Sequence, residues 1–195
     1  MKFVLATFNR DKARELQALL ALPGVEIVPV ADFPGAVAPE EDGATLRENA
    51  LIKARAAVQL TGLPSLADDT GLEVDALDGA PGIHAARFAG PGATYADNVV
   101  RLLKELEARP GAPRTARFRT ACVALFPDGR ELTSEGVLDG EIVSEARGTF
   151  GFGYDPVFVI PDGRTLAEVP PAEKNSISHR ARAVRNMAAQ LAGAR

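Results

Sequence analysis

The 195-residue sequence has little of several features that define other protein classes. Its single cysteine, Cys122, cannot form an internal disulfide and leaves no CxxC pair for a redox or zinc site. Because Cys122 lies between apolar neighbours, we interpret it as a small buried side chain. The longest stretch without a charged residue, 56–67, is too short to cross a bilayer, which needs about 20 residues. The N-terminal apolar run, 3–6, is too short for a signal peptide, and we expect a cytoplasmic protein.

Positive charge is not in excess either. The chain has 22 Lys and Arg against 26 Asp and Glu, which gives a net charge of −4. This balance argues against bulk binding to nucleic acid or to an anionic membrane, but it leaves room for a local basic pocket. With 46% hydrophobic residues the chain can build a real core, and its length predicts one domain, residues 1–195, with room for two lobes.

Several common catalytic motifs are absent. No G-x-x-x-x-G-K-[ST] sequence is present, which excludes a Walker P-loop. The nearest approach to the dinucleotide-binding G-x-G-x-x-G begins at Gly151, but Pro156 takes the place of its third glycine. There is no HExxH or G-x-S-x-G motif. The two histidines, His84 and His179, cannot form a zinc triad with one cysteine.

The order of expected elements predicts an α/β protein. Strands at 2–7 and 25–30 flank a helix at 11–21, which Asn9 or Asp11 can cap and Pro23-Gly24 ends. A capping box at 45–48 begins a helix that runs to about residue 61 and ends at Gly62. Next come strands at 65–67 and 71–77, then a Gly- and Pro-rich segment at 78–93, which is either a long ordered loop or a candidate lid, and a helix at 94–107. Strands at 117–126 and 130–137, joined by a turn, an aromatic and glycine-rich segment at 150–160 and a helix at 175–191 complete the chain.

Two segments carry polar residues where open α/β sheets bind ligands. Residues 7–12 (TFNRDK) join the first strand to the first helix, where the exposed N–H groups of the helix start and the charge of Lys12 favour binding of an anion. A capped helix with a solvated basic face explains the same residues equally well. Asp68 and Asp69 end a short strand and point to opposite faces, one to the helices and one to a cleft. A carboxylate there can hold Mg²⁺ or deprotonate water, or cap a turn. The acidic loop 40–42 could add a metal ligand, although an ordinary acidic loop is the stronger interpretation.

Three further segments carry candidate chemistry. Asn49 and Lys53 are four residues apart and share a helix face that could reach the acidic loop, although a solvated lysine is the default interpretation. Residues 148–156 place aromatic rings among glycines, which suits stacking on a planar base or, for Phe150, packing in the core. The segment 174–180 (KNSISHR) could donate to base carbonyls or phosphate, or form a helix cap with an exposed basic turn.

A series of short motifs runs along nearly the whole chain: Thr7-Phe8-Asn9-x-x-Lys12, Glu48-Asn49-Ala50-x-x-Lys53-Ala54, Ala67-Asp68-Asp69-Thr70-Gly71-Leu72, Gly79-x-Pro81-Gly82, Phe152-Gly153-Tyr154-Asp155-Pro156, Lys174 and Ser178-His179-Arg180. The order of these motifs resembles the Ham1-like family of inosine triphosphate pyrophosphatases, also called dITP/XTP pyrophosphatases. Phe8 departs from the resemblance, because the family often has glycine there.

The resemblance implies an elongated mixed β-sheet flanked by helices, with two lobes around a central cleft, in a homodimer. It implies Mg²⁺-dependent hydrolysis of dITP, ITP, XTP and dXTP to the monophosphate and pyrophosphate. Asp69 then resembles the general base and a metal ligand, and Glu41 the second Mg²⁺ carboxylate. The residues that the resemblance assigns to the triphosphate and sugar are Thr7, Phe8, Asn9, Arg10, Asp11, Lys12, Lys53 and Thr70. Those that it assigns to the base are Phe152, Gly153, Tyr154, Asp155, Lys174, His179 and Arg180.

Two alternatives remain open at the level of the sequence. One is a pyrophosphatase of similar shape that acts on dUTP, dTTP or modified pyrimidines. The other is a nucleotide-binding regulatory module without turnover.

Overall fold

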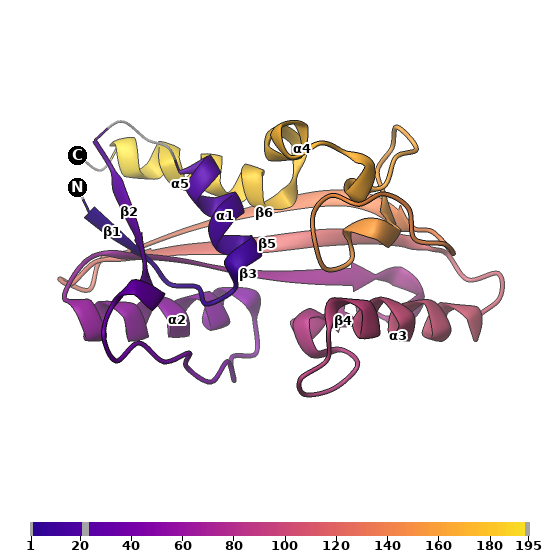
Figure 1. Ribbon diagram of the computed structural model, residues 1–195, viewed down its shortest axis with the longest axis horizontal. Coiled ribbons are helices and arrows are strands. Elements are labelled where there is room, and N and C mark those ends of the chain that lie inside the picture. Colours follow the sequence, from indigo (N-terminus) through magenta and orange to yellow (C-terminus); the bar gives the residue numbers. More distant parts are fainter. Residues whose placement is uncertain (1, 21–23, 194–195) are drawn as a thin grey trace. The chain divides into compact units, whose positions relative to one another are not determined.

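The computed structural model describes residues 2–20 and 24–193, and the chain forms two compact units (Figure 1). Unit 1 comprises Met1–Asp69, Thr120–Gly136 and His179–Arg195, and unit 2 comprises Thr70–Arg119 and Val137–Ser178. Parallel and antiparallel strand pairs both occur, and helices flank them, so the predicted mixed α/β class is confirmed.

Unit 1 begins with the predicted β-α-β arrangement. Strand β1 (Lys2–Leu5) pairs in parallel with β2 (Glu26–Pro29) and with the start of β3 (Ser65–Val74). Helix α1 (Arg10–Leu19) connects β1 to β2, and the side chain of Asn9 caps it. All three elements are shorter than predicted, and the expected end at Pro23 lies outside the described residues.

Helix α2 (Leu46–Thr61) has the ends that the sequence predicts. Thr45 and Glu48 form the capping box, and Gly62 closes the helix in the left-handed conformation with φ +67°. Its small residues Ala50, Ala54 and Ala57 pack against β1 and β3, which brings α2 close to the sheet. Helices α1 and α5 (His179–Gly193) cover the opposite face of this unit (Figure 1).

Strands β5 (Thr115–Leu125) and β6 (Glu131–Ile142) follow β3 in the sheet and are joined by the predicted turn at 127–129. Both extend further than predicted. Cys122 is fully buried in the core of unit 1, as predicted, and burial raises the pKa of its thiol, which makes it unreactive.

Helix α5 approaches β6 most closely at Gly136. A Cβ added to Gly136 would overlap the carbonyl oxygen of His179 and the amide nitrogen of Ala183, both of them backbone atoms. Ser134, two residues earlier, donates to the carbonyl oxygen of Ala183 at 2.8 Å. The start of α5, which carries His179 and Arg180, is therefore held directly against the sheet.

Gly136→Ala is expected to lower the free energy of unfolding by about 3 kcal/mol, because the backbone of α5 must shift to admit a methyl group. Gly193→Ala on the same helix is the matched control, since a Cβ there meets open space and should cost nothing. Urea denaturation measures both. Equal stability of the two variants would contradict the close approach.

Unit 2 contains the remaining parts of β3, β5 and β6, with helices α3 (Tyr95–Glu107) and α4 (Pro171–Ile177). The short strands β4 (Pro81–Gly82) and β7 (Phe158–Val159) pair antiparallel with β3 and β6. Its core includes Leu102 and Leu106 of α3 with Phe118 and Phe158, whose ring centroids lie 4.6 Å apart.

Two expectations are wrong, and one alternative that the sequence left open is resolved. The strands predicted at 65–67 and 71–77 are one continuous strand, β3, so Asp69 lies within a strand and not at its end. The helix predicted at 175–191 is two helices, because Ser178 between α4 and α5 has extended backbone with ψ 158°. Phe150 is 45% exposed and is not a core aromatic, whereas Tyr154 is buried.

Within the part of the chain that the structure describes, helices long and apolar enough to cross a membrane are absent.

Candidate active site

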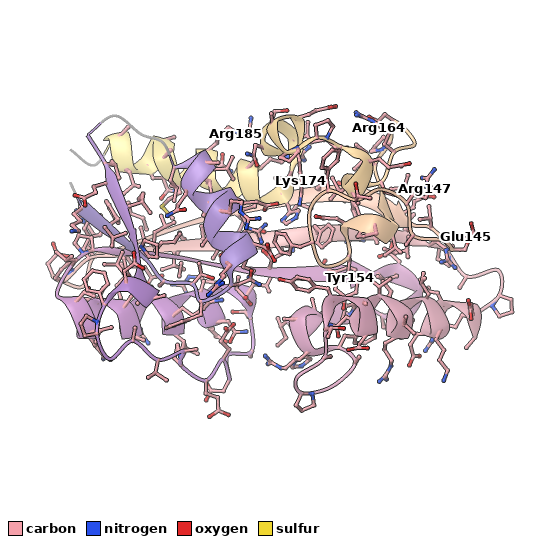
Figure 2. The ribbon with its side chains drawn as sticks, viewed as in Figure 1. Glu145, Arg147, Tyr154, Arg164, Lys174 and Arg185 are labelled. Carbon is pink, nitrogen blue, oxygen red and sulfur yellow. The ribbon has the colours of Figure 1, made fainter. Side chains whose placement is uncertain are left out.

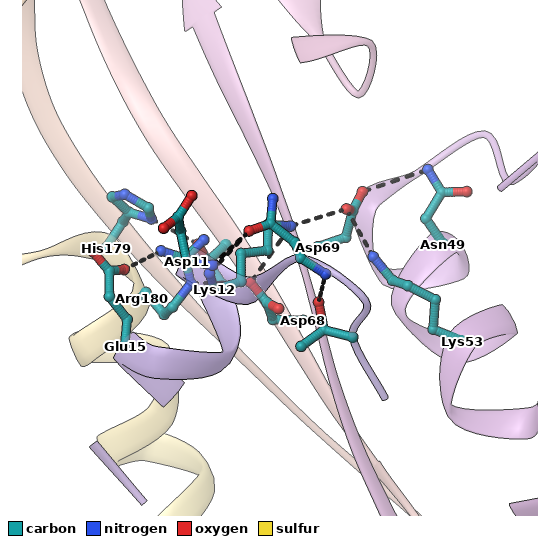
Figure 3. Close-up of polar contacts among 12 residues, drawn as sticks. Asp11, Lys12, Glu15, Asn49, Lys53, Asp68, Asp69, His179 and Arg180 are labelled. Carbon is teal, nitrogen blue, oxygen red and sulfur yellow. Dashed lines mark hydrogen bonds and ion pairs between the residues drawn. The ribbon is translucent and has the colours of Figure 1, made fainter. Parts of the chain in front are cut away.

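Asp68 and Asp69 lie next to each other on β3 and send their carboxylates to opposite faces, as predicted (Figure 3). Asp68 contacts Arg180 of α5. Asp69 contacts Asn49 and Lys53 of α2. Both aspartates are buried, at 0% and 6% exposure, so each charge depends on the side chains around it.

The first charge cluster surrounds Asp69. Nζ of Lys53 donates to Asp69 Oδ1 at 3.0 Å and to Glu41 Oε2 at 3.2 Å, and Nζ of Lys12 lies 3.7 Å from Asp69 Oδ1. Asn49 Nδ2 donates to Asp69 Oδ2 at 3.4 Å. Two cations and two carboxylates from four segments thus meet in one place. We call Lys12, Glu41, Asn49, Lys53 and Asp69 the Asp69 cluster.

Lys53 is not the solvated surface lysine of the default interpretation, because its side chain is only 10% exposed. Burial by itself would lower the pKa of Lys53, but Asp69, Asp68 and Glu41 outweigh it and raise this pKa above its ordinary value. The ammonium is therefore firmly charged. A buried, fully charged lysine beside carboxylates is suited to binding an anion such as phosphate.

A close backbone contact fixes Asn49. Its Oδ1 accepts from the amide of Gly43 at 2.9 Å, and a Cβ on Gly43 would lie 2.7 Å from that same oxygen. Only glycine fits there. The loop that carries Glu41 is thus anchored to the helix that carries Asn49 and Lys53.

The second charge cluster surrounds Asp68. Its Oδ2 accepts from Arg180 Nε at 3.1 Å and lies 3.8 Å from Lys12 Nζ, and Arg180 also donates to Glu15 of α1. Burial alone would raise the pKa of Asp68, but Lys12, Arg180 and Lys53 hold it well below its usual range. Asp68 therefore stays ionised and links β3, α1 and α5.

His179 lies at the start of α5, beside this network. Its Nδ1 is hydrogen-bonded to the hydroxyl of Thr120 on β5 at 2.7 Å, and both residues are buried. The contact fixes the orientation of the imidazole ring.

The segment between β1 and α1 is built around Asn9. Its Oδ1 accepts from the amides of Asp11 and Lys12, and Thr7 Oγ1 accepts from the amide of Asn9 at 3.2 Å. Arg10 is exposed in the first turn, and Asp11 pairs with Arg14. Phe8 is 41% exposed. Asp78 is the only non-glycine residue with positive φ in the described ranges, so Phe8 has ordinary backbone where the family often has glycine.

Unit 2 holds the aromatic candidates. Lys174 Nζ donates to Asp155 Oδ2 at 2.5 Å, and this oxygen also accepts from the amide of Phe152 at 2.9 Å. Nζ of Lys174 lies 5.2 Å from the Phe152 ring centroid, and the Tyr95 ring packs against the Phe152 ring at a tilt of 37° with the centroids 5.6 Å apart. We call Tyr95, Phe152, Asp155 and Lys174 the Phe152 cluster. It offers a partly exposed ring beside a buried ion pair.

Three other candidates in unit 2 are placed differently. Tyr154 is 5% exposed, and this burial raises the pKa of its hydroxyl. The hydroxyl donates to the carbonyl oxygen of Ala85 at 2.8 Å. Tyr154 and Lys174 are both labelled in Figure 2. Gly153 lies in a turn with φ +65° and is half-buried. Thr70, the residue after Asp69 on β3, is also half-buried.

Sequence reasoning missed Glu15 and Thr120, which hold Arg180 and His179. Glu15 could have been found from the sequence, because it is three residues after Lys12 and therefore lies on the same helix face as this candidate site residue. No sequence signal pointed to Thr120, because its partner is 59 residues away.

The fold and the Asp69 cluster define a class: an α/β protein with a buried group of lysines and carboxylates suited to a polyphosphate and a divalent cation. Residues 3–190 match the Ham1 family model, and the chain belongs to this family.

Individual relatives match over nearly their full length. The dITP/XTP pyrophosphatase of Thioalkalivibrio sulfidiphilus is 51% identical over 196 residues, which cover 99% of this chain and 100% of that protein. The dITP/XTP pyrophosphatase of Desulforamulus reducens is 49% identical over 95% of this chain and 92% of that protein. The solved structure of a HAM1 protein from Coxiella burnetii has a TM-score of 0.90 with 42% identity and covers 99% of each chain. The resemblance drawn from the motifs is confirmed.

Proposed function

We propose that this chain hydrolyses noncanonical purine nucleoside triphosphates (dITP, ITP, XTP and dXTP) to the monophosphate and pyrophosphate. The names of its full-length relatives support this activity. The observation that carries the assignment of the site is that Lys12 and Lys53 meet at Asp69, while Glu41 contacts the same Lys53 ammonium. Hydrolysis of a phosphoanhydride needs a positioned water, a base and charge neutralisation, and this cluster offers groups for each.

The residues of the Asp69 cluster fit a divalent cation such as Mg²⁺. Glu41 and Asp69 both contact one ammonium group, so the two carboxylates are directed at one point, and side-chain adjustment would bring their oxygens to the distance of about 2 Å that a small ion requires. Among residues 2–20 and 24–193, no group of three or more candidate metal ligands gathers, which leaves the remaining positions to phosphate oxygens and water. Mg²⁺ bound there would neutralise charge on the phosphates.

Each residue of the cluster then has a proposed role. Lys12 and Lys53 hold the phosphate oxygens, and the amides at the start of α1 add donors next to Thr7 and Asn9. Asp69 orients the attacking water and takes its proton as the water oxygen bonds to the α-phosphorus and pyrophosphate leaves. Arg180, which contacts both Asp68 and Glu15, holds Asp68 and therefore the part of β3 that carries Asp69.

The base is assigned to the Phe152 cluster, together with His179 and Arg180. The Phe152 ring is partly exposed, and an exposed aromatic face suits stacking on a purine. Hypoxanthine and xanthine carry a 6-keto oxygen where adenine has an amine, so donors from His179 or Arg180 would favour the keto group and reject adenine.

A homodimer and a cytoplasmic location complete the proposal, and both rest on the family resemblance and the composition. Sedimentation equilibrium of the full chain tests the dimer, and a mass of one chain at micromolar concentration would contradict it.

A substrate panel with pyrophosphate release as the readout tests the function. We expect kcat/KM for dITP and XTP to exceed that for dATP by at least about 100-fold. Activity should disappear when Mg²⁺ is removed and return when it is restored. A strong preference for dUTP or dTTP over dITP would replace this proposal with the pyrimidine alternative, which no observation favours at present.

A further inference from the structure

Lys53 occupies a position where its charge competes with a metal. Its Nζ lies between Asp69 Oδ1 at 3.0 Å and Glu41 Oε2 at 3.2 Å, so one ammonium bridges the two proposed metal ligands. The remaining Asp69 oxygen accepts from Asn49, and Oδ1 also faces Lys12. The side chains of the protein thus already neutralise the carboxylates that would bind the cation. Figure 3 shows Asn49 and Lys53 on Asp69.

We propose that Lys53 is an exchangeable counterion, which keeps Glu41 and Asp69 from binding a divalent cation until a polyphosphate draws its ammonium group away. The inference rests on the proposed function, because it takes these carboxylates as metal ligands and a polyphosphate as the anion. Metal and polyphosphate are then coupled through one side chain, and each raises the affinity for the other by the same factor.

The charge and burial of the site favour replacement of the Lys53 ammonium by the metal over simultaneous binding of both cations. The side chains of Lys53 and Asp69 are 10% and 9% exposed, so solvent screens their interaction poorly. A dication within reach of both carboxylates would lie against the ammonium and repel it. The ammonium cannot simply lose its partners, because a buried unpaired charge is costly. A phosphate supplies the new partner, and the flexible four-carbon stem lets Nζ move while α2 stays in place.

A permanent, purely structural ion pair predicts a different outcome. In that case Lys53 only fixes the positions of Glu41 and Asp69, and its removal would loosen both carboxylates and weaken metal binding. Under exchange, its removal takes away a competitor. The two roles therefore predict opposite changes in metal affinity when Lys53 loses its charge.

The test measures the binding of Mn²⁺ alone to the full chain by titration calorimetry. We expect Lys53→Met to bind Mn²⁺ about 10-fold more tightly than the unmodified chain. Arg55→Met is the matched control, because Arg55 is an exposed residue of the same helix and its loss removes the same charge. It should change the affinity by less than about 2-fold.

Equal or weaker Mn²⁺ binding by a folded Lys53→Met chain would overturn the exchange. Lys53→Gln, which removes the charge and keeps a donor, should give the same increase and serves if Lys53→Met does not fold. In the unmodified chain, saturating methylenediphosphonate should raise Mn²⁺ affinity about 10-fold after correction for complexes in solution. An unchanged affinity there would likewise overturn the exchange.

Glu41→Gln separates this inference from the proposed function. If Glu41→Gln leaves Mn²⁺ binding unchanged, the assignment of the metal site itself is wrong. If Glu41→Gln weakens Mn²⁺ binding but Lys53→Met does not strengthen it, only the exchange is wrong.

Discussion

Asp69→Asn is expected to lower kcat for dITP by about 10²–10⁴-fold, because an amide cannot take the proton of the attacking water. Asparagine keeps the shape of the side chain and can still contact Asn49 and Lys53, so the substrate should still bind. Pyrophosphate release gives kcat, and titration calorimetry gives the nucleotide affinity of the variant. Lost turnover with retained binding is the result that identifies a base.

Asp42→Asn is the matched control for Asp69→Asn. Asp42 is an exposed residue of the same acidic loop as Glu41, and its replacement should leave kcat within about 2-fold. Hydrolysis by Asp69→Asn at the rate of the unmodified chain would contradict the assigned base. A chain that binds dITP but never releases pyrophosphate, with or without Mg²⁺, would instead be the regulatory module considered from the sequence.

Asp68→Asn is expected to lower the free energy of unfolding by about 3–5 kcal/mol. Asp68 is fully buried, and its carboxylate balances Arg180, whose guanidinium is 2% exposed. Removing the negative charge leaves Arg180 with Glu15 and places Lys12 beside a neutral amide. Burying cations without enough counter-charge is the reason for the large cost. Urea denaturation followed by circular dichroism measures it.

Asp162→Asn makes the same chemical change in a surface ion pair. Asp162 pairs with Arg164, and their side chains are 45% and 39% exposed, so this change should cost less than about 1 kcal/mol. If Asp68→Asn were no less stable than Asp162→Asn, the buried network would not stabilise the fold as described.

Features set by local sequence were predictable. The Thr45–Glu48 capping box, the left-handed Gly62 and the Asn9 cap each depend on residues within four positions of one another, and the structure has all three. The opposite orientation of Asp68 and Asp69 also follows from the two-residue period of a strand. The α/β class followed from the order of such elements.

Features set by distant residues were not predictable from local patterns. The two aspartates suggested that a strand ends there, yet β3 continues, because Lys53 and Arg180 neutralise the two carboxylates from opposite faces. Lys53 looked like a surface lysine for the same reason: its partner Asp69 is 16 residues away. The single helix predicted at 175–191 ran through Ser178 because both sides of it favour helix, although a helix cap in this segment was one of the alternatives that the sequence left open.

Aromatic residues gave the least reliable signal. Phe150 was a candidate for the core and is exposed, whereas Tyr154 is buried with its hydroxyl bonded to Ala85. Glycine-rich turns leave no periodicity that could tell an inward ring from an outward one. The assignment of the base to this segment therefore rests on the resemblance and on the Phe152 cluster.

The most direct test of the central assignment is a crystal structure of the full chain with Mn²⁺ and a non-hydrolysable α,β-imido analogue of dITP. We expect an anomalous Mn²⁺ peak about 2 Å from oxygens of Glu41 and Asp69, phosphates beside Lys12, and the hypoxanthine against Phe152. A nucleotide and metal bound away from Asp69, or a base that does not contact the Phe152 cluster, would contradict the account.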